Sequence, residues 1–155
     1  MGIMTFLPVF FLSVISVREA REAYFRSSAG TKESKKFESL MDSVSDDDVP
    51  VLICYKGAAQ MLKAKNAVNP ISKLSFFKRG KMLIEQGLMK DTTCVESHFI
   101  RFTIQHNLPG FLGYNQNLNM DSTMIADALP EMSDNDLKVK ITAYYKQLKI
   151  GRKSE

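Results

Sequence analysis

The chain lacks several features that would mark a common class of protein. Its 155 residues contain two cysteines, two histidines and no tryptophan. The two cysteines, Cys54 and Cys94, allow at most one bridge, which excludes a disulfide-built scaffold. No apolar run reaches the roughly 20 residues that a membrane-spanning helix needs. No segment alternates apolar and polar residues over the length of a strand, so the sequence predicts no β-sheet.

Residues that usually carry catalysis or hold a cofactor are equally sparse. His98 and His106 would point about 80° apart on a helix, which makes them a poor metal-binding pair. The HExxH pattern is absent, and the glycines at 110–113 lack the lysine of a phosphate-binding loop. We therefore expect no enzyme, no catalytic residue, no cofactor and no metal. A hydrolase that uses His98 or His106 remains an alternative.

The first sixteen residues contain no charged side chain. The apolar run at 6–15 fits the hydrophobic core of a secretory signal peptide, with Val14 and Ser16 as the small residues before a cut at Val17. A buried N-terminal helix or an uncleaved anchor is the alternative, because only the α-amino group supplies a positive charge ahead of the run. We predict a signal peptide over 1–16 and a periplasmic or secreted protein of the cell envelope.

Export would place the two cysteines in an oxidising compartment. A bridge between Cys54 and Cys94 then requires that their helices pack side by side. Two buried thiols that behave as small apolar residues are the alternative, and the apolar surroundings favour it.

The formal net charge is only +4, but the charges are unevenly distributed. Positions 49–84 contain no acidic residue, and acidic residues lie on both sides. The seven basic residues of this centre are Lys56, Lys63, Lys65, Lys73, Lys78, Arg79 and Lys81. Such a centre can bind an anionic partner, or the acidic flanks can fold back and neutralise it; we favour the second. Nucleic acid is not expected, because Phe76 and Phe77 fall on the apolar stripe of their own helix. A peripheral contact with anionic lipid is a further alternative.

Hydrophobic periodicity and capping residues predict an all-α fold of about seven antiparallel helices, either an array or an irregular bundle. They form a single domain at 17–150, followed by a disordered tail at 151–155. Thr31 is expected to cap the second helix, and Asp48 to stabilise the start of the third. The expected helices lie at 17–28, from 31, at 49–67, 70–89, 93–106 and 119–129, and from about 134. The fifth is apolar around most of its circumference and is expected at the centre of the domain.

The third and fourth helices resemble the helix pair of a tetratricopeptide-type repeat. The segment YKGAAQML at 55–62 resembles the first helix of such a repeat, and FFKRGKMLIEQGLMKD at 76–91 resembles the second. ESHFIRFTIQHN at 96–107 would begin the next unit. Gly57 and Gly80 are 23 residues apart, whereas the corresponding repeat positions lie about a dozen apart. The resemblance is therefore degenerate.

A second resemblance covers 55–114. The segments YKGAAQMLKAK, NPISKLSFFKRG and IRFTIQHNLPGFLGY are similar to a family of small, uncharacterised bacterial envelope proteins. His98 stands where an arginine is more usual in that pattern. The resemblance implies export and a helical domain, and it brings no known activity.

The fifth helix carries a polar stripe within about 60° of its circumference. Its members are Cys94, His98, Arg101 and Gln105. The functional interpretation is a groove that offers a cation and amide donors to a carboxylate or a peptide backbone. The alternatives are a solvent-exposed edge, or Arg101 paired internally with Glu96, Glu85 or an aspartate. An arginine buried in so apolar a helix would need such a partner.

The loop QHNLPGFLGYNQN at 105–117 is unusually apolar. Phe111, Leu112 and Tyr114 are expected to fold back over the end of the fifth helix and close the core. The Tyr114 hydroxyl and the polar residues 115–117 would be the parts able to reach a ligand.

Together these patterns predict a monomeric, non-enzymatic module that binds a protein or peptide near the fifth helix. The predicted ligand-binding residues are His98, Arg101, Gln105 and Tyr114. A structural accessory protein without a ligand groove is the alternative.

Overall fold

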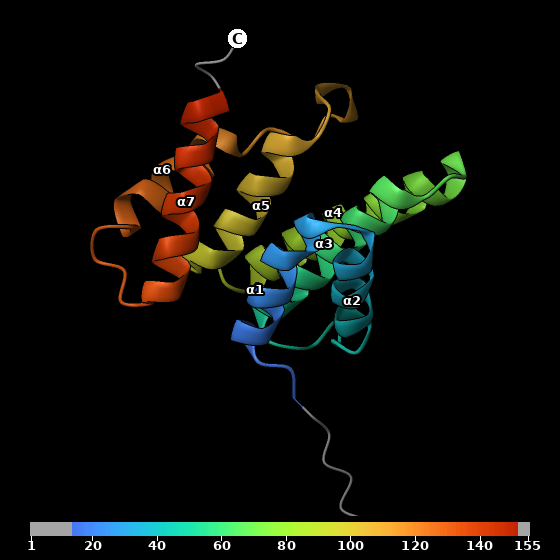
Figure 1. Ribbon diagram of the computed structural model, residues 1–155, viewed down its shortest axis with the longest axis horizontal. Helices are drawn as coiled ribbons and strands as arrows, with labels where there is room; N and C mark the ends of the chain where they lie inside the picture. The colour runs from blue at the N-terminus through green and yellow to red at the C-terminus, as the bar shows by residue number, and fades with distance from the viewer. Residues whose placement is uncertain (1–13, 152–155) are drawn as a thin grey trace, which may run out of the picture.

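The computed structural model describes residues 14–151 and contains seven α-helices, with no strand in this range (Figure 1). The helices are α1 (Val17–Arg26), α2 (Thr31–Asp42), α3 (Pro50–Asn66), α4 (Pro70–Lys90), α5 (Val95–Asn107), α6 (Leu118–Ala128) and α7 (Asn135–Gly151). Short 3-10 turns, η1 (Ser27–Ala29) and η2 (Gly110–Leu112), follow α1 and α5. The all-α prediction is confirmed. The predicted signal peptide and tail fall largely outside the described residues.

Local capping explains where several helices begin. Ser16 Oγ accepts a hydrogen bond from the Glu19 amide at 3.1 Å, and Asn69 Oδ1 accepts one from the Ile71 amide at 2.8 Å. Asp134 caps α7 through the Leu137 amide, as the sequence predicts.

Two capping predictions are wrong. The N-cap of α2 is Gly30, which has a positive φ of 147°, and Thr31 is the first helical residue. Asp48 accepts a hydrogen bond from the Ser45 amide, within the loop that precedes α3. The start of α3 is set instead by Pro50, whose missing N–H costs nothing in the first turn.

Helices α3 and α4 form an antiparallel hairpin whose backbones meet through glycines. A Cβ on Gly57 would lie 2.8 Å from the Gly80 carbonyl oxygen, and one on Gly80 would lie 2.9 Å from the Gly57 carbonyl oxygen. A Cβ on Gly87 would lie 2.6 Å from the Pro50 carbonyl oxygen and would also collide with Cys54 Sγ. The hairpin therefore depends on three positions without a side chain.

Gly87→Ala should destabilise the protein although alanine favours helix more than glycine does. The added methyl meets a carbonyl of the helix backbone, which cannot rotate away, so the two helices must separate. We expect the free energy of unfolding to fall by about 1–3 kcal/mol in urea titrations. Gly110→Ala is the matched control, since a Cβ there meets no atom within 4 Å. Equal stability of the two variants would contradict the close approach.

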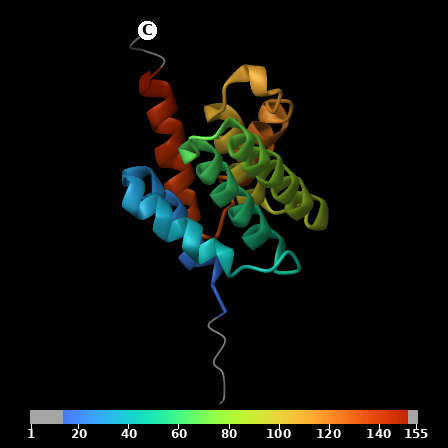
Figure 2. The same ribbon diagram turned by 90° about the vertical axis from the view of Figure 1, so that its right-hand side faces the viewer.

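Helix α5 lies between two apolar clusters, as predicted for the most apolar helix. One cluster joins α1–α4 and includes Phe37, Tyr55 and Ile84. The other joins α5 to α6 and α7 and includes Phe99 and Ile141. Figure 1 shows α5 with α7 on one side and the α3–α4 hairpin on the other, and Figure 2 views the hairpin from its turn. All residues from Glu96 to Gln105 are buried.

Candidate functional site

All four predicted ligand-binding residues lie in one region between α4, α5 and α6, and all are buried. His98, Arg101, Gln105 and Tyr114 are each at most 5% exposed. Their polar atoms point at other protein groups. The structure thus brings the predicted residues together but places them inside the molecule.

The centre of this region is Asp121, a fully buried residue of α6. Its Oδ2 accepts a hydrogen bond from Arg101 Nε at 2.8 Å, and its Oδ1 accepts one from Arg101 Nη2 at 2.7 Å. His98 Nδ1 lies 2.7 Å from Asp121 Oδ1, and His98 Nε2 lies 2.9 Å from the Thr92 carbonyl oxygen. Both ring nitrogens of His98 therefore face acceptors, which suits a protonated imidazole.

Glu85 of α4 completes the network on its other side. Its Oε2 accepts a hydrogen bond from Arg101 Nη1 at 2.8 Å, and its Oε1 accepts one from the Tyr114 hydroxyl at 2.6 Å. Gln105 exchanges two hydrogen bonds with Asn117, one through each end of its amide. The predicted pairing of Arg101 with Glu85 and an aspartate is confirmed. The alternative partner Glu96 binds Arg21 instead.

These contacts shift the protonation of the buried groups. The hydrogen bond to Asp121 raises the pKa of His98, against the opposing effect of burial. Burial alone would raise the pKa of Asp121, but the hydrogen bonds from Arg101 and His98 outweigh it and lower that pKa. Burial, reinforced by the contact with Glu85, raises the pKa of Tyr114 far above its usual range. These contacts therefore favour the protonated form of His98 and the ionised form of Asp121.

The polar stripe on α5 is therefore part of a buried network of internal hydrogen bonds and ion pairs. The Arg101 guanidinium group donates two hydrogen bonds to Asp121 and one to Glu85. A ligand carboxylate would have to displace Asp121 or Glu85 to reach it. Burial and internal pairing thus favour the structural alternative over an open groove.

The prediction that the loop after α5 folds back and closes the core is confirmed for Tyr114 and wrong for Phe111. The Tyr114 ring is buried and packs edge-on against Phe77, with their centroids 6.3 Å apart. Phe111 is 87% exposed because η2 carries it outward, and Leu112 is only half-buried. Gly113, at φ 61°, adopts the left-handed conformation that returns Tyr114 to the core.

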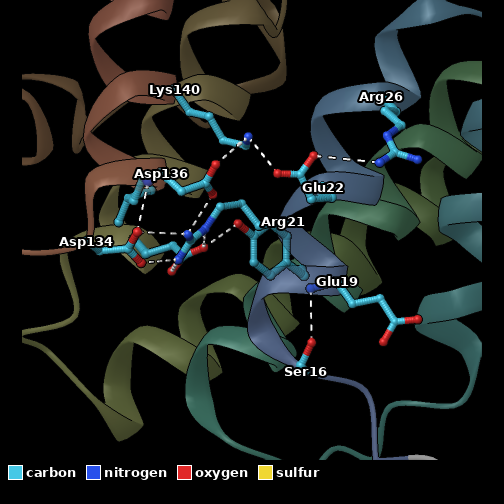
Figure 3. A network of polar contacts seen from close by, with 11 residues as sticks. Ser16, Glu19, Arg21, Glu22, Arg26, Asp134, Asp136 and Lys140 are labelled. Atoms are coloured by element: carbon cyan, nitrogen blue, oxygen red, sulfur yellow. Dashed lines mark hydrogen bonds and ion pairs between the residues drawn. The ribbon is translucent and has the colours of Figure 1, made fainter.

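A second buried network, which the sequence did not reveal, surrounds Arg21 of α1. The Arg21 guanidinium donates two hydrogen bonds to Glu96, at 2.7 and 2.8 Å, and further ones to Asp134 and Asp136 (Figure 3). The Tyr55 hydroxyl donates to Glu96 Oε1 at 2.6 Å. The network joins α1 and α3 to α5 and to the start of α7.

A lysine extends this connection along α7. Lys140 Nζ lies 2.8 Å from Glu22 Oε1 and 3.0 Å from Asp136 Oδ1, and it also lies over the Phe25 ring (Figure 3). The residues beside Arg21 line a shallow depression between α1 and α7. Because the Arg21 guanidinium already has several carboxylate partners, it is not free to bind a ligand in this depression.

The remaining candidate groups do not form a reactive constellation. His106 is exposed and stacks among the Phe102 and Tyr144 rings, apart from His98. Cys54 and Cys94 are free thiols, and burial raises the pKa of Cys54 to about 12, which leaves it unreactive. Within residues 14–151, no three histidine, cysteine or acidic side chains are grouped to hold a metal ion. No helix of the same range combines the length and apolar character needed to cross a bilayer.

The acidic flank neutralises only part of the basic centre. Asp46 pairs with Lys56 and Arg79, and Asp42 pairs with Lys63. The late acidic residues Asp134 and Asp136 pair with Arg21 instead. Within the described chain, no carboxylate pairs with the exposed lysines Lys65, Lys73 and Lys78. The favoured interpretation of the charge pattern is thus confirmed for three of the seven cations.

The unneutralised lysines lie beside an apolar surface. The outer face of α4 exposes a line of side chains within about 80° of the helix circumference. They are Ile71, Leu74, Lys78, Met82 and Met89, and we call them the outer α4 face. Glu85 lies within the same arc, but Arg101 and Tyr114 occupy its carboxylate. The outer α4 face therefore presents apolar groups and positive charge without a free acid.

Comparison with known proteins provides no independent assignment. The chain matches no protein-family model, no curated protein and no solved structure.

Proposed function

We propose that the protein is a non-enzymatic interaction module that docks through the outer α4 face. The observation that carries this proposal is the line of exposed apolar side chains along a helix of 21 residues. Isolated apolar residues are common on protein surfaces, whereas several exposed apolar residues gathered on one face are typical of a docking surface. The docking surface proposed here differs from the predicted groove on α5, because that groove is buried and internally paired.

The arrangement of the polar groups supports a module without catalysis. His98 is held between Asp121 and a backbone carbonyl, and no serine or cysteine of residues 14–151 forms a hydrogen bond with it. Ser97, its neighbour, is fully buried and leaves its hydroxyl without a hydrogen-bond partner. A hydrolase would need a nucleophile within reach of both the base and the substrate. A docking function requires only the rigid fold that these networks stabilise.

The proposed location is the cell envelope, on the strength of the apolar run at 6–15. The predicted cut at Val17 has a structural cost, since Ser16 caps α1. Cleavage there would remove the cap and place an α-amino charge at the positive end of the helix dipole. Edman sequencing of protein from the envelope decides between a cleaved and an uncleaved chain.

The test of the proposed function is capture from a detergent-free envelope extract that contains both membrane fragments and proteins. The bait variant replaces the apolar residues of the outer α4 face by serine: Ile71→Ser, Leu74→Ser, Met82→Ser and Met89→Ser. The matched control is Val139→Ser, which alters an exposed apolar residue on α7. Recovered protein is measured by mass spectrometry and recovered phospholipid by phosphate assay.

We expect the wild type and the Val139→Ser control to recover the same material and the four-site variant to lose it at least about tenfold, or about 1.4 kcal/mol. All these side chains are exposed, so circular dichroism should show an unchanged fold. Retention of all material by the four-site variant would place docking elsewhere. Recovery of nothing by the wild type would favour a structural accessory protein.

A further inference from the structure

The turn between α3 and α4 is the most exposed apolar part of the described chain. Val68 is 97% exposed, Ile71 is 80% exposed and Leu74 is 50% exposed. Figure 1 shows this turn projecting away from the other helices. We call residues 65–78 the hairpin tip. Within residues 14–151, these three aliphatic side chains are left largely uncovered by the other helices.

The charge of the hairpin tip has a single sign. Lys65, Lys73 and Lys78 are exposed, and the tip contains no acidic residue. Of the carboxylates on α2, Asp42 pairs with Lys63, and Glu38 accepts hydrogen bonds from Ser34 and Asn66. The occupant of this surface should therefore be both apolar and anionic.

A second copy of the chain does not meet this requirement. Pairing two hairpin tips would bring together the same uncompensated lysines, and the repulsion would oppose association. An acidic protein is also a poor fit, because the centre of a protein interface is normally depleted in lysine and built around aromatic or arginine anchors in pockets. The hairpin tip contains no arginine, and its two aromatic residues, Phe76 and Phe77, are partly buried.

An anionic bilayer fits the hairpin tip better. Its interfacial layer accepts a projecting apolar element without a preformed groove, and aliphatic residues beside lysines are the usual composition of peripheral membrane contacts. We propose that the hairpin tip inserts Val68, Ile71 and Leu74 into the interface of an anionic membrane while the flanking lysines contact lipid headgroups. This inference rests on the proposed docking function and specifies what occupies the end of the outer α4 face that is nearest the turn.

The absence of tryptophan permits a local test in the full chain. Ile71→Trp introduces a single tryptophan at the hairpin tip, and Val139→Trp introduces one at an exposed site on α7. The probes are vesicles of equal parts phosphatidylcholine and phosphatidylglycerol, with brominated acyl chains as quencher, and vesicles of phosphatidylcholine alone. We expect blue-shifted and quenched emission from Ile71→Trp with the mixed vesicles, and no change from Val139→Trp. Because the reporter is local, binding through the N-terminal apolar run would not imitate this result.

The charge requirement is tested in the Ile71→Trp background. Lys65→Gln, Lys73→Gln and Lys78→Gln together should weaken partition into the mixed vesicles at least about tenfold. Each lysine near an anionic surface adds to the electrostatic attraction, and the triple variant removes three of them. An unchanged Ile71→Trp spectrum with the mixed vesicles, or equal quenching by phosphatidylcholine alone, would overturn the inference.

The two proposals fail in different ways. If Ile71→Trp ignores the vesicles while the four-site serine variant still loses captured protein, the occupant is a protein. The docking function then stands and the membrane inference falls. If the capture experiment shows no dependence on the outer α4 face, the proposed function falls as well.

Discussion

Asp121→Ala should cause a large loss of stability. Asp121 is fully buried and is the shared acceptor of Arg101 and His98. Its removal leaves two buried groups without their principal anion, and breaking a buried charge pair from one side typically costs about 3–5 kcal/mol. Urea unfolding followed by far-UV circular dichroism would measure the change. Asp127→Ala is the control, because Asp127 is exposed on the same helix.

The same substitution should change the pH dependence of stability. The lowered pKa of Asp121 gives stability that is present above the unfolded value of about 3.9 and is lost as pH falls through the lower folded value. The raised pKa of His98 gives stability that is present below about 6.5 and is lost as pH rises through the higher folded value. Asp121→Ala should remove both contributions and flatten the profile. Parallel profiles for the variant and the wild type would refute a charged pair.

Arg21→Ala should have an effect of similar size in a different part of the molecule. Arg21 is buried and provides the cation for Glu96, Asp134 and Asp136. Without it, Glu96 is a buried carboxylate whose one remaining hydrogen-bond partner among residues 14–151 is the Tyr55 hydroxyl. We expect a loss of about 3–5 kcal/mol in the free energy of unfolding, measured in urea.

Two further variants test the cause of that loss. Arg26→Ala removes an exposed arginine of the same helix, whose contact with Glu22 is 3.8 Å long, and should cost less than about 1 kcal/mol. Glu96→Gln combined with Arg21→Met should be more stable than Arg21→Ala alone, because no buried charge is left uncompensated. If the double variant is the less stable of the two, desolvation of Glu96 is not the main cause of the loss of stability in Arg21→Ala.

Features that depend on a single helix could be predicted from the sequence more reliably than contacts between helices. The apolar circumference of α5 predicted its central position, and the need of Arg101 for an acidic partner predicted its pairing. Arg21 gave no comparable signal, since its partners lie 75, 113 and 115 residues away. Which carboxylate reaches a given arginine is decided by the packing of whole helices, and helical periodicity carries no information about that packing.

The loop after α5 shows a second limit of local patterns. Phe111 and Tyr114 are both aromatic and only three residues apart, so composition alone predicted that both would be buried. The backbone turn at η2 and the positive φ of Gly113 send them in different directions. Tyr114 is favoured inside because its hydroxyl has an acceptor in Glu85, and Phe111 remains at the surface.

The burial of ten consecutive residues of α5 also bears on how such a chain can diverge. A change at almost any position from Glu96 to Gln105 alters packing or a charge network, so sequence drift there should be slow. The outer α4 face carries few internal contacts and can change without loss of the fold. Related chains would therefore keep α5 nearly fixed and vary the exposed residues of α4, so that one scaffold could acquire different docking preferences.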